Sequence, residues 1–243
     1  MMKYFLLMVL ICSVFQPIKS QTNQFDHSLF DELLKEYVDD NGLVKYEAFL
    51  NNQKFEKYVA SLKKTDLDKM NEKENYAFLI NAYNALVIKN VIDHWPIDSP
   101  MDADGFFDKK KFKVGSKELT LNNIEYDLLF KINPVLCHFG LVCGATSCPR
   151  LLQMTYKEKN VYDQLNVNAN EFLNDQAKNR LDKETNTLYL SEIFKWFKDI
   201  FIEEYGSLKN AAAEFMNEED ADYLGKNDVT IKYIRYNWKL NSQ

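Results

Sequence analysis

One long apolar stretch that ends at Pro96 constrains the fold more than any other feature of the sequence. Asn71, followed three residues later by Glu74, has the pattern of a helix start in which Asn71 takes the place of the usual Ser or Thr. Pro96 prevents the helix from continuing. About 24 residues at 1.5 Å per residue make a helix of about 36 Å. Its middle, residues 76–88, is apolar almost all round, which predicts a helix buried on every side.

Shorter elements are predicted before and after this helix. Amphipathic spacing predicts helices over residues 25–38, 52–63, 121–130 and 157–178, and a further helix that begins after Ser191. Strands are predicted in a hairpin over 112–120 and over 135–142, 188–190 and 229–238. Only 7 Gly and 5 Pro favour helices with short connections over a β-sandwich. We therefore expect an α+β fold: a helix-rich single domain whose long central helix packs on a small, mostly antiparallel sheet.

The N-terminus has the pattern of a signal peptide. Residues 1–3 are a short basic start, residues 4–15 are an apolar run of 12, and Ser20 is a small residue at the expected cleavage edge. The run is too short to span a bilayer, and no later run reaches that length. We expect residues 1–20 to be removed and the protein to be exported, to the periplasm or beyond. Lipid attachment at Cys12 is disfavoured because Ile11, rather than a small residue, precedes it.

The charge balance narrows the range of partners. The chain has 30 basic and 36 acidic residues, and loss of Lys3 and Lys19 with the leader leaves 28 basic residues and a net charge of −8. This argues against nucleic-acid binding, which needs clustered Lys and Arg. The partner is not determined, and a small molecule or a peptide is the ligand class that fits. No cofactor or metal is predicted, because histidines and cysteines lack ligand spacing and the acidic loop 97–110 misses the calcium pattern.

Residues 137–150, CHFGLVCGATSCPR, hold three of the four cysteines and one of the three histidines. Two interpretations of them stay open. Cys143 and Cys148 flank four residues that include Gly144, a span that a disulfide can close, which would leave Cys137 as an ordinary buried cysteine. Alternatively, Cys143 or Cys148 is a nucleophile and His138 its base. If residues 135–142 form a strand, His138 and Cys143 point to opposite faces, about 16 Å apart, and cannot form a dyad.

Polar residues inside the apolar helix need partners. Asn81 and Asn84 are three residues apart and share a face, with Tyr83 beside them. Because an unsatisfied buried amide costs about 1–3 kcal/mol, we expect these amides to hold the backbone of a neighbouring loop, such as residues 144–147. Donation to a substrate is the alternative. Four aromatic residues after Ser191 are interpreted as core: Phe194, Trp196, Phe197 and Phe201.

Four collinear motifs resemble the family called domain of unknown function 547: FLINAYNALVIKNVIDHWP, KFKVGSKELTLNNIEYDLL, HFGLVCGATSCPRL and LSEIFKWFKDIF. The terminal IKYIRYNWKLN resembles the segment that follows that domain. The family includes secreted bacterial proteins, so the resemblance implies an exported bacterial member with its family domain over residues 70–243 and an N-terminal helical extension over 21–69. It implies a shared site, not a reaction. By position, the motif residues here are Asn81, Tyr83, Asn84, Glu125, His138, Cys143, Gly144, Ser147, Cys148 and Pro149.

Two hypotheses about function follow. The first, favoured because it is the simpler, is a binding or scaffold module with a Cys143–Cys148 disulfide. The second is a thiol-dependent hydrolase or acyl transferase with Cys143 or Cys148 as nucleophile and His138 and Glu125 in the same pocket. The candidate binding residues are Asn81, Tyr83, Asn84, Gly144 and Ser147. Whether the protein is an enzyme stays open on the sequence, because an enzyme needs a free, accessible thiol and a binding module does not.

Overall fold

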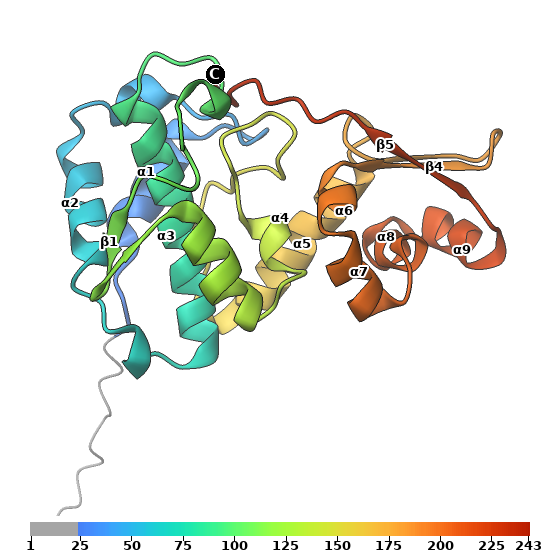
Figure 1. Cartoon of the computed structure of the whole chain (residues 1–243), viewed down its shortest axis with the longest axis horizontal. Coiled ribbons are helices and arrows are strands. Elements are labelled where there is room, and N and C mark those ends of the chain that lie inside the picture. Colours follow the sequence, from blue (N-terminus) through green and yellow to red (C-terminus); the bar gives the residue numbers. More distant parts are fainter. Residues whose placement is uncertain (1–23) are drawn as a thin grey trace, which may run out of the picture.

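The computed structural model describes residues 24–243, so the expected signal peptide over residues 1–20 and Cys12 lie outside it. Figure 1 shows two adjoining regions joined by α5. Helices α1–α4 and the β1–β2 hairpin form the first, and β3–β5 with α6–α9 form the second. After β5 the chain returns to the first region, where the Asn241 amide donates to the Gly144 carbonyl and the Val44 amide donates to the Asn241 carbonyl. Both regions share a continuous hydrophobic core, and the α+β class is confirmed.

The first region is mainly helical. Its elements are α1 (Ser28–Tyr37), η1 (Tyr46–Phe49), α2 (Gln53–Leu62), η2 (Leu67–Lys69), α3 (Glu72–Asp93), η3 (Pro100–Asp102), β1 (Phe112–Val114), β2 (Lys117–Leu119), η4 (Asn123–Leu128), η5 (Leu129–Lys131), α4 (Cys137–Gly140) and η6 (Glu158–Asn160). Helix α5 (Val161–Asn174) follows and joins this region to the second. The helices expected over 25–38, 52–63 and 157–178 are therefore present with shorter bounds. The segment expected as a helix over 121–130 is a π-helix, η4, followed by a 3₁₀ turn, η5.

Helix α3 is the predicted central helix. The Asn71 side chain accepts a hydrogen bond from the Glu74 amide at 3.1 Å, as the start pattern predicts. Every residue from Tyr76 to Ile92 is buried except Lys89. The neighbours of α3 are mainly α2, α5, η1, η4, η5 and η6. Helices rather than the expected sheet cover most of α3, because a helix that is apolar on all sides needs cover on all sides and the strands are too short to give it.

The strands form two small sheets. Strands β1 and β2 pair antiparallel across the expected turn, where Gly115 has a φ of +58°. The second region contains β3 (Arg180–Asp182), β4 (Thr187–Ser191), α6 (Ile193–Trp196), α7 (Lys198–Tyr205), α8 (Leu208–Phe215), α9 (Glu218–Lys226) and β5 (Thr230–Ile234). Strand β4 pairs antiparallel with β3 and parallel with β5. The parallel pairing arises because α6–α9 form the connection from β4 to β5, which brings the chain back in the same direction.

The prediction of a strand over residues 135–142 is wrong. Residues Cys137–Gly140 form the short helix α4, and an extended segment begins at Leu141. No neighbouring strand satisfies this backbone. The Asn84 side chain does so, donating to the Gly140 carbonyl and accepting from the Val142 amide, both at 2.9 Å. A Cβ on Gly140 would lie 2.6 Å from a methyl of Leu165, so only glycine allows α4 to approach α5 so closely. A short apolar run cannot by itself distinguish a buried strand from a buried helical turn.

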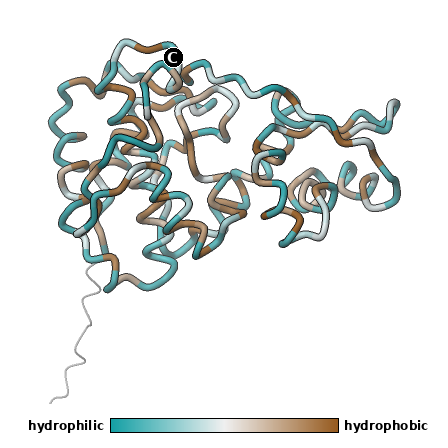
Figure 2. The backbone as a smooth tube through the Cα atoms, viewed as in Figure 1, coloured by the Kyte–Doolittle hydropathy of each residue, from teal (hydrophilic) through white to brown (hydrophobic). Residues whose placement is uncertain are grey.

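Apolar residues occur in short segments separated by polar ones throughout the fold (Figure 2). Within residues 24–243, no helix is both long enough and apolar enough to cross a membrane.

Candidate functional site

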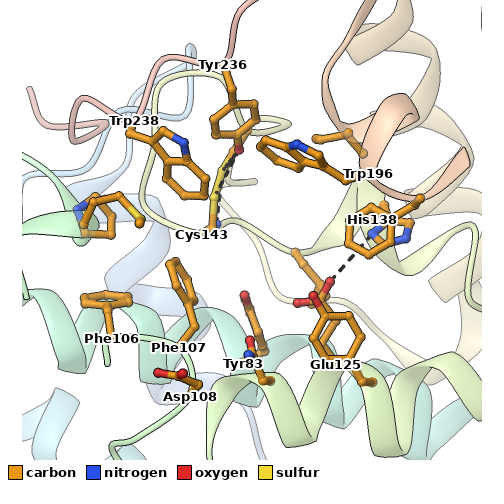
Figure 3. A pocket seen from close by; sticks show the side chains of 18 of the residues that line it. Tyr83, Phe106, Phe107, Asp108, Glu125, His138, Cys143, Trp196, Tyr236 and Trp238 are labelled. Atoms are coloured by element: carbon orange, nitrogen blue, oxygen red, sulfur yellow. Dashed lines mark hydrogen bonds and ion pairs between the residues drawn. A yellow bond between two sulfur atoms is a disulfide. The ribbon is translucent and has the colours of Figure 1, made fainter. Parts of the chain in front are cut away.

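A cavity of about 530 Å³ opens where the two regions meet (Figure 3). Its walls come from the loop 97–110, η4, α4, the loop that follows α4, α6 and the C-terminal segment after β5. Five of the nine candidate catalytic and binding residues lie in its lining, together with the motif residue Pro149; the five are Tyr83, Glu125, His138, Cys143 and Cys148. The tertiary structure therefore brings these five side chains to one cavity from three helical elements and a loop.

Cys143 and Cys148 form a disulfide, with their Cα atoms 6.5 Å apart. The Tyr236 hydroxyl contacts both sulfur atoms at 3.1 Å. Cys137 is the free cysteine of the described residues; it is fully buried, and burial raises the pKa of its thiol well above the ordinary value. Of the two interpretations of this motif, the structure has the disulfide, and the unpaired cysteine is an interior residue without access to solvent.

His138 and Glu125 form a buried pair at one side of the cavity. The His138 Nδ1 atom lies 3.8 Å from the Glu125 Oε1 atom, and their side chains are 4% and 12% exposed. The imidazole packs on the Phe197 ring, with 3.9 Å between ring centroids. Burial lowers the pKa of His138 to about 3. Burial raises the pKa of Glu125 to about 7, against an opposing effect of Tyr83. Both shifts favour the neutral form, since charge is poorly solvated at this depth.

Asn81 and Asn84 lie beneath the cavity and not in its lining. Both arms of the Asn81 amide bond to the backbone of Tyr156, and both arms of Asn84 bond to Gly140 and Val142. The expectation that these amides are structural is confirmed, but they hold residues 140–142 and 156 rather than 144–147. Because both side chains are buried outside the cavity lining, with the oxygen and one N–H of each bound to the backbone, neither is placed to donate to a substrate.

Gly144 and Ser147 hold the C-terminal segment in place. Gly144 has a φ of +84°, which glycine adopts without strain, and its carbonyl accepts from the Asn241 amide. The Ser147 hydroxyl accepts from the Asn237 amide at 2.8 Å. These bonds fix the segment that carries Tyr236 and Trp238 against the disulfide loop. Gly144 and Ser147, which were expected to bind a ligand, therefore support the cavity wall instead of lining it.

The cavity also contains residues that the sequence did not indicate. Trp196 and Phe197, expected in the core, line the cavity, and Trp196 is 45% exposed; Phe194 and Phe201 are buried as expected. The acidic loop 97–110, where no site was predicted, contributes Phe106, Phe107, Asp104 and Asp108 among others. Tyr236 and Trp238 complete the set. For Phe106 and Phe107 the available signal was the presence of two large aromatic residues in a loop, where no local core requires them. No such signal marked Trp196, Tyr236 and Trp238, because they lie in segments expected to be a helix or a strand.

The side chains of the cavity limit the chemistry that it can support. Among residues 24–243, no group of three or more His, Cys, Asp or Glu side chains is placed to hold a metal ion. Both cavity cysteines are used in the disulfide. What remains is an aromatic wall facing a buried carboxyl group, and a carboxyl whose pKa is displaced by burial in a cleft is typical of a functional site.

Residues 67–173 match a family model described as Protein of unknown function, DUF547. The match runs from η2 to α5 and contains every residue expected at the site. Trp196, Tyr236 and Trp238, which close the cavity, lie beyond it. No curated protein and no solved structure matches the chain.

Proposed function

The chain belongs, through residues 67–173, to the DUF547 family, and from the geometry of its cavity we propose that it is an exported binding module for a small molecule or a peptide. The observation that carries the proposal is a cavity of about 530 Å³ with eight Phe, Tyr and Trp residues in its lining. Small-molecule sites are usually pockets of about 300–1,000 Å³ that combine apolar walls with a few polar groups. The export component rests on the N-terminal pattern alone.

The exposure of apolar side chains supports a ligand at this place. Six large hydrophobic residues are exposed within the described chain, and three of them, Met101, Tyr126 and Trp196, line the cavity. Single exposed apolar side chains are common on protein surfaces, but a cluster of them in a concave site usually marks a binding surface. A scaffold that used only the outer surface would not need this cavity, so a ligand-binding role explains more of the structure.

Tryptophan fluorescence tests the proposal. Trp196 and Trp238 line the cavity, whereas Trp95 stacks on Tyr46 elsewhere. In a screen of small molecules and short peptides, we expect at least one compound to give a saturable change in emission. Trp196→Ala should weaken its binding at least tenfold, as expected for loss of a large aromatic contact. Tyr233→Ala, which removes an exposed aromatic side chain outside the cavity, should leave the affinity unchanged.

Two outcomes would contradict the binding role. Compounds that bind both variants equally would place the binding site elsewhere on the molecule. The absence of any saturable ligand, with both variants folded by circular dichroism, would remove the proposal.

A thiol-dependent hydrolase or acyl transferase is the second candidate, because Cys143, His138 and Glu125 meet at one cavity. Two features count against it. The disulfide leaves no sulfur free to attack a substrate. In addition, an imidazole with a pKa of about 3 is a poor base for a thiol, whose ordinary pKa is about 8.5. This activity would require a reduced form of the protein.

Cysteine mapping by mass spectrometry separates the two candidates. The three cysteines share one tryptic peptide, residues 132–150, because no Lys or Arg lies between Lys131 and Arg150. Chymotryptic cleavage after Phe139 separates Cys137 from the other two. For protein purified without reductant, we expect peptide 140–150 to be lighter by two hydrogens and unlabelled until reduction. We expect Cys137 to be labelled only after unfolding, since it is 0% exposed. Rapid labelling of Cys143 or Cys148 in the native protein near neutral pH would instead favour the thiol enzyme.

A further inference from the structure

The charged groups of the cavity are of one sign. Three carboxyl groups line it, those of Asp104, Asp108 and Glu125, and within the described part of the chain no lysine or arginine does. The Asp104 carboxylate is paired with the Lys109 ammonium at 2.7 Å, so its charge is largely compensated. Asp108 and Glu125 are left without a basic partner in the lining. An anionic ligand would therefore meet only repulsion here, and a cation would meet complementary charge.

Aromatic rings form the wall opposite the carboxyl group of Glu125 (Figure 3). Trp196 and Trp238 stack with 5.9 Å between centroids and 21° between planes, and the Tyr236 ring is tilted against both at 4.8 and 4.7 Å. Phe107 approaches Trp238 at 6.2 Å. The faces of such rings carry negative electrostatic potential and attract cations within about 6 Å of the centroid. Several rings around one cavity are the usual arrangement for recognition of alkylated ammonium groups.

Glu125 is placed to balance a positive charge. Its side chain lines the cavity and is 12% exposed, and the nearby His138 imidazole, which burial keeps neutral, supplies no positive charge. Tyr83, Tyr126 and Tyr236 also border it, and none of them carries positive charge. A buried carboxylate without a cation is unfavourable, and a bound cation would supply the missing counter-charge. A neutral ligand would supply no counter-charge, and the carboxyl group would instead favour its protonated form, as burial already makes it do.

We propose that the ligand of this cavity is a small organic cation with an alkylated ammonium group, held between the Trp196–Tyr236–Trp238 rings and the carboxylate of Glu125. The inference rests on the proposed binding function and specifies its ligand class. An alkylated ammonium fits better than a primary amine, because a compact ammonium is strongly hydrated and loses more solvation on entering an aromatic site. The semi-enclosed volume of about 530 Å³ accommodates a small molecule.

A matched pair of ligands tests the charge requirement. Choline and 3,3-dimethylbutan-1-ol have almost the same shape, but only choline is charged. At pH 8.5, where Glu125 is mostly ionised given a pKa of about 7, we expect choline to bind at least tenfold more tightly in a tryptophan-fluorescence titration. Trp196→Ala and Glu125→Gln should each weaken choline binding at least fivefold. Glu125→Gln should not weaken binding of the neutral alcohol, and Tyr233→Ala should change neither ligand.

The outcomes separate the ligand class from the binding function. Equal binding of choline and the alcohol would overturn the cation inference and leave the cavity a binding site. A second outcome is that neither choline nor the alcohol binds, while a screened compound binds and Trp196→Ala weakens that binding. The cation inference then fails as well, and the proposed binding function stands. If no compound binds at all, both fail. Choline binding that survives Trp196→Ala and Glu125→Gln, with both variants folded, would overturn the assignment of the cation to this cavity.

Discussion

Replacing Glu125 with glutamine is expected to raise the free energy of unfolding at pH 8.5 by about 3 kcal/mol. The pKa of this carboxyl is about 7 in the folded protein, against 4.5 for an unperturbed glutamate, because burial disfavours the charged form. The folded state thus binds the proton more tightly than the unfolded chain does. The stability linked to the protonated form is fully present below pH 4.5 and is lost as the pH rises through 7. Glutamine resembles the protonated acid at every pH, so it avoids this loss.

Urea unfolding of the two proteins between pH 5 and pH 8.5 measures the effect. The difference should be small at pH 5 and reach its full value above pH 7.5. Burial lowers the pKa values of His27 and His138 to about 3, so their contribution is lost as the pH falls from 6.5 toward 3 and does not affect the comparison above pH 7. Glu118→Gln is the control, since that side chain is 62% exposed. Equal stabilities of wild type and Glu125→Gln at pH 8.5 would contradict the placement of a destabilised carboxyl in this cavity.

A stabilising Glu125→Gln variant would bear directly on function. A buried acid that lowers the stability of its own fold at neutral pH is expected where the group has a task that requires charge. Together with loss of choline binding in the same variant, it would show that stability and ligand recognition make opposite demands on Glu125.

Asn84→Ala is expected to lower the free energy of unfolding by about 3 to 4 kcal/mol. The Asn84 side chain is 3% exposed, donates to the Gly140 carbonyl and accepts from the Val142 amide, so its loss leaves two buried backbone groups without their partner. Each such group costs about 1–3 kcal/mol. Urea unfolding measures the loss, and Asn166→Ala, at an exposed position of α5, is the matched control for removal of an asparagine from a helix.

Asn84→Asp refines this second test. Aspartate keeps the acceptor for the Val142 amide but cannot donate to the Gly140 carbonyl when it is ionised, and it places a charge in the core. We expect it to be at least as destabilising as alanine near neutral pH and to recover part of the loss at low pH. A loss below about 1 kcal/mol for Asn84→Ala would mean that Asn84 does not hold the segment that leads to Cys143.

Features set by neighbours in the sequence were predictable. Asn71, Glu74 and Pro96 mark the ends of α3, and glycine at position 115 marks the hairpin turn. The span of four residues between Cys143 and Cys148 was compatible with the disulfide that the structure contains. The role of Asn81 and Asn84 followed from one physical rule, that a buried amide must find partners. In each case the determining atoms lie within a few residues or on one helix face, so spacing and propensity carry the information.

The cavity itself is a product of tertiary structure. Residues 137–140 were expected in a strand and form a helix, because Asn84, more than 50 positions earlier, supplies the hydrogen bonds that a partner strand would have made. Trp196 lines the cavity rather than the core because the segment after β5 returns to the disulfide loop. The bond between Ser147 and Asn237 that secures this return spans 90 positions. Local sequence determined the long helices, the hairpin and the span of the disulfide. Helix α4, and which side chains face one another across the cavity, were decided by long-range contacts, whose partners no local pattern specifies.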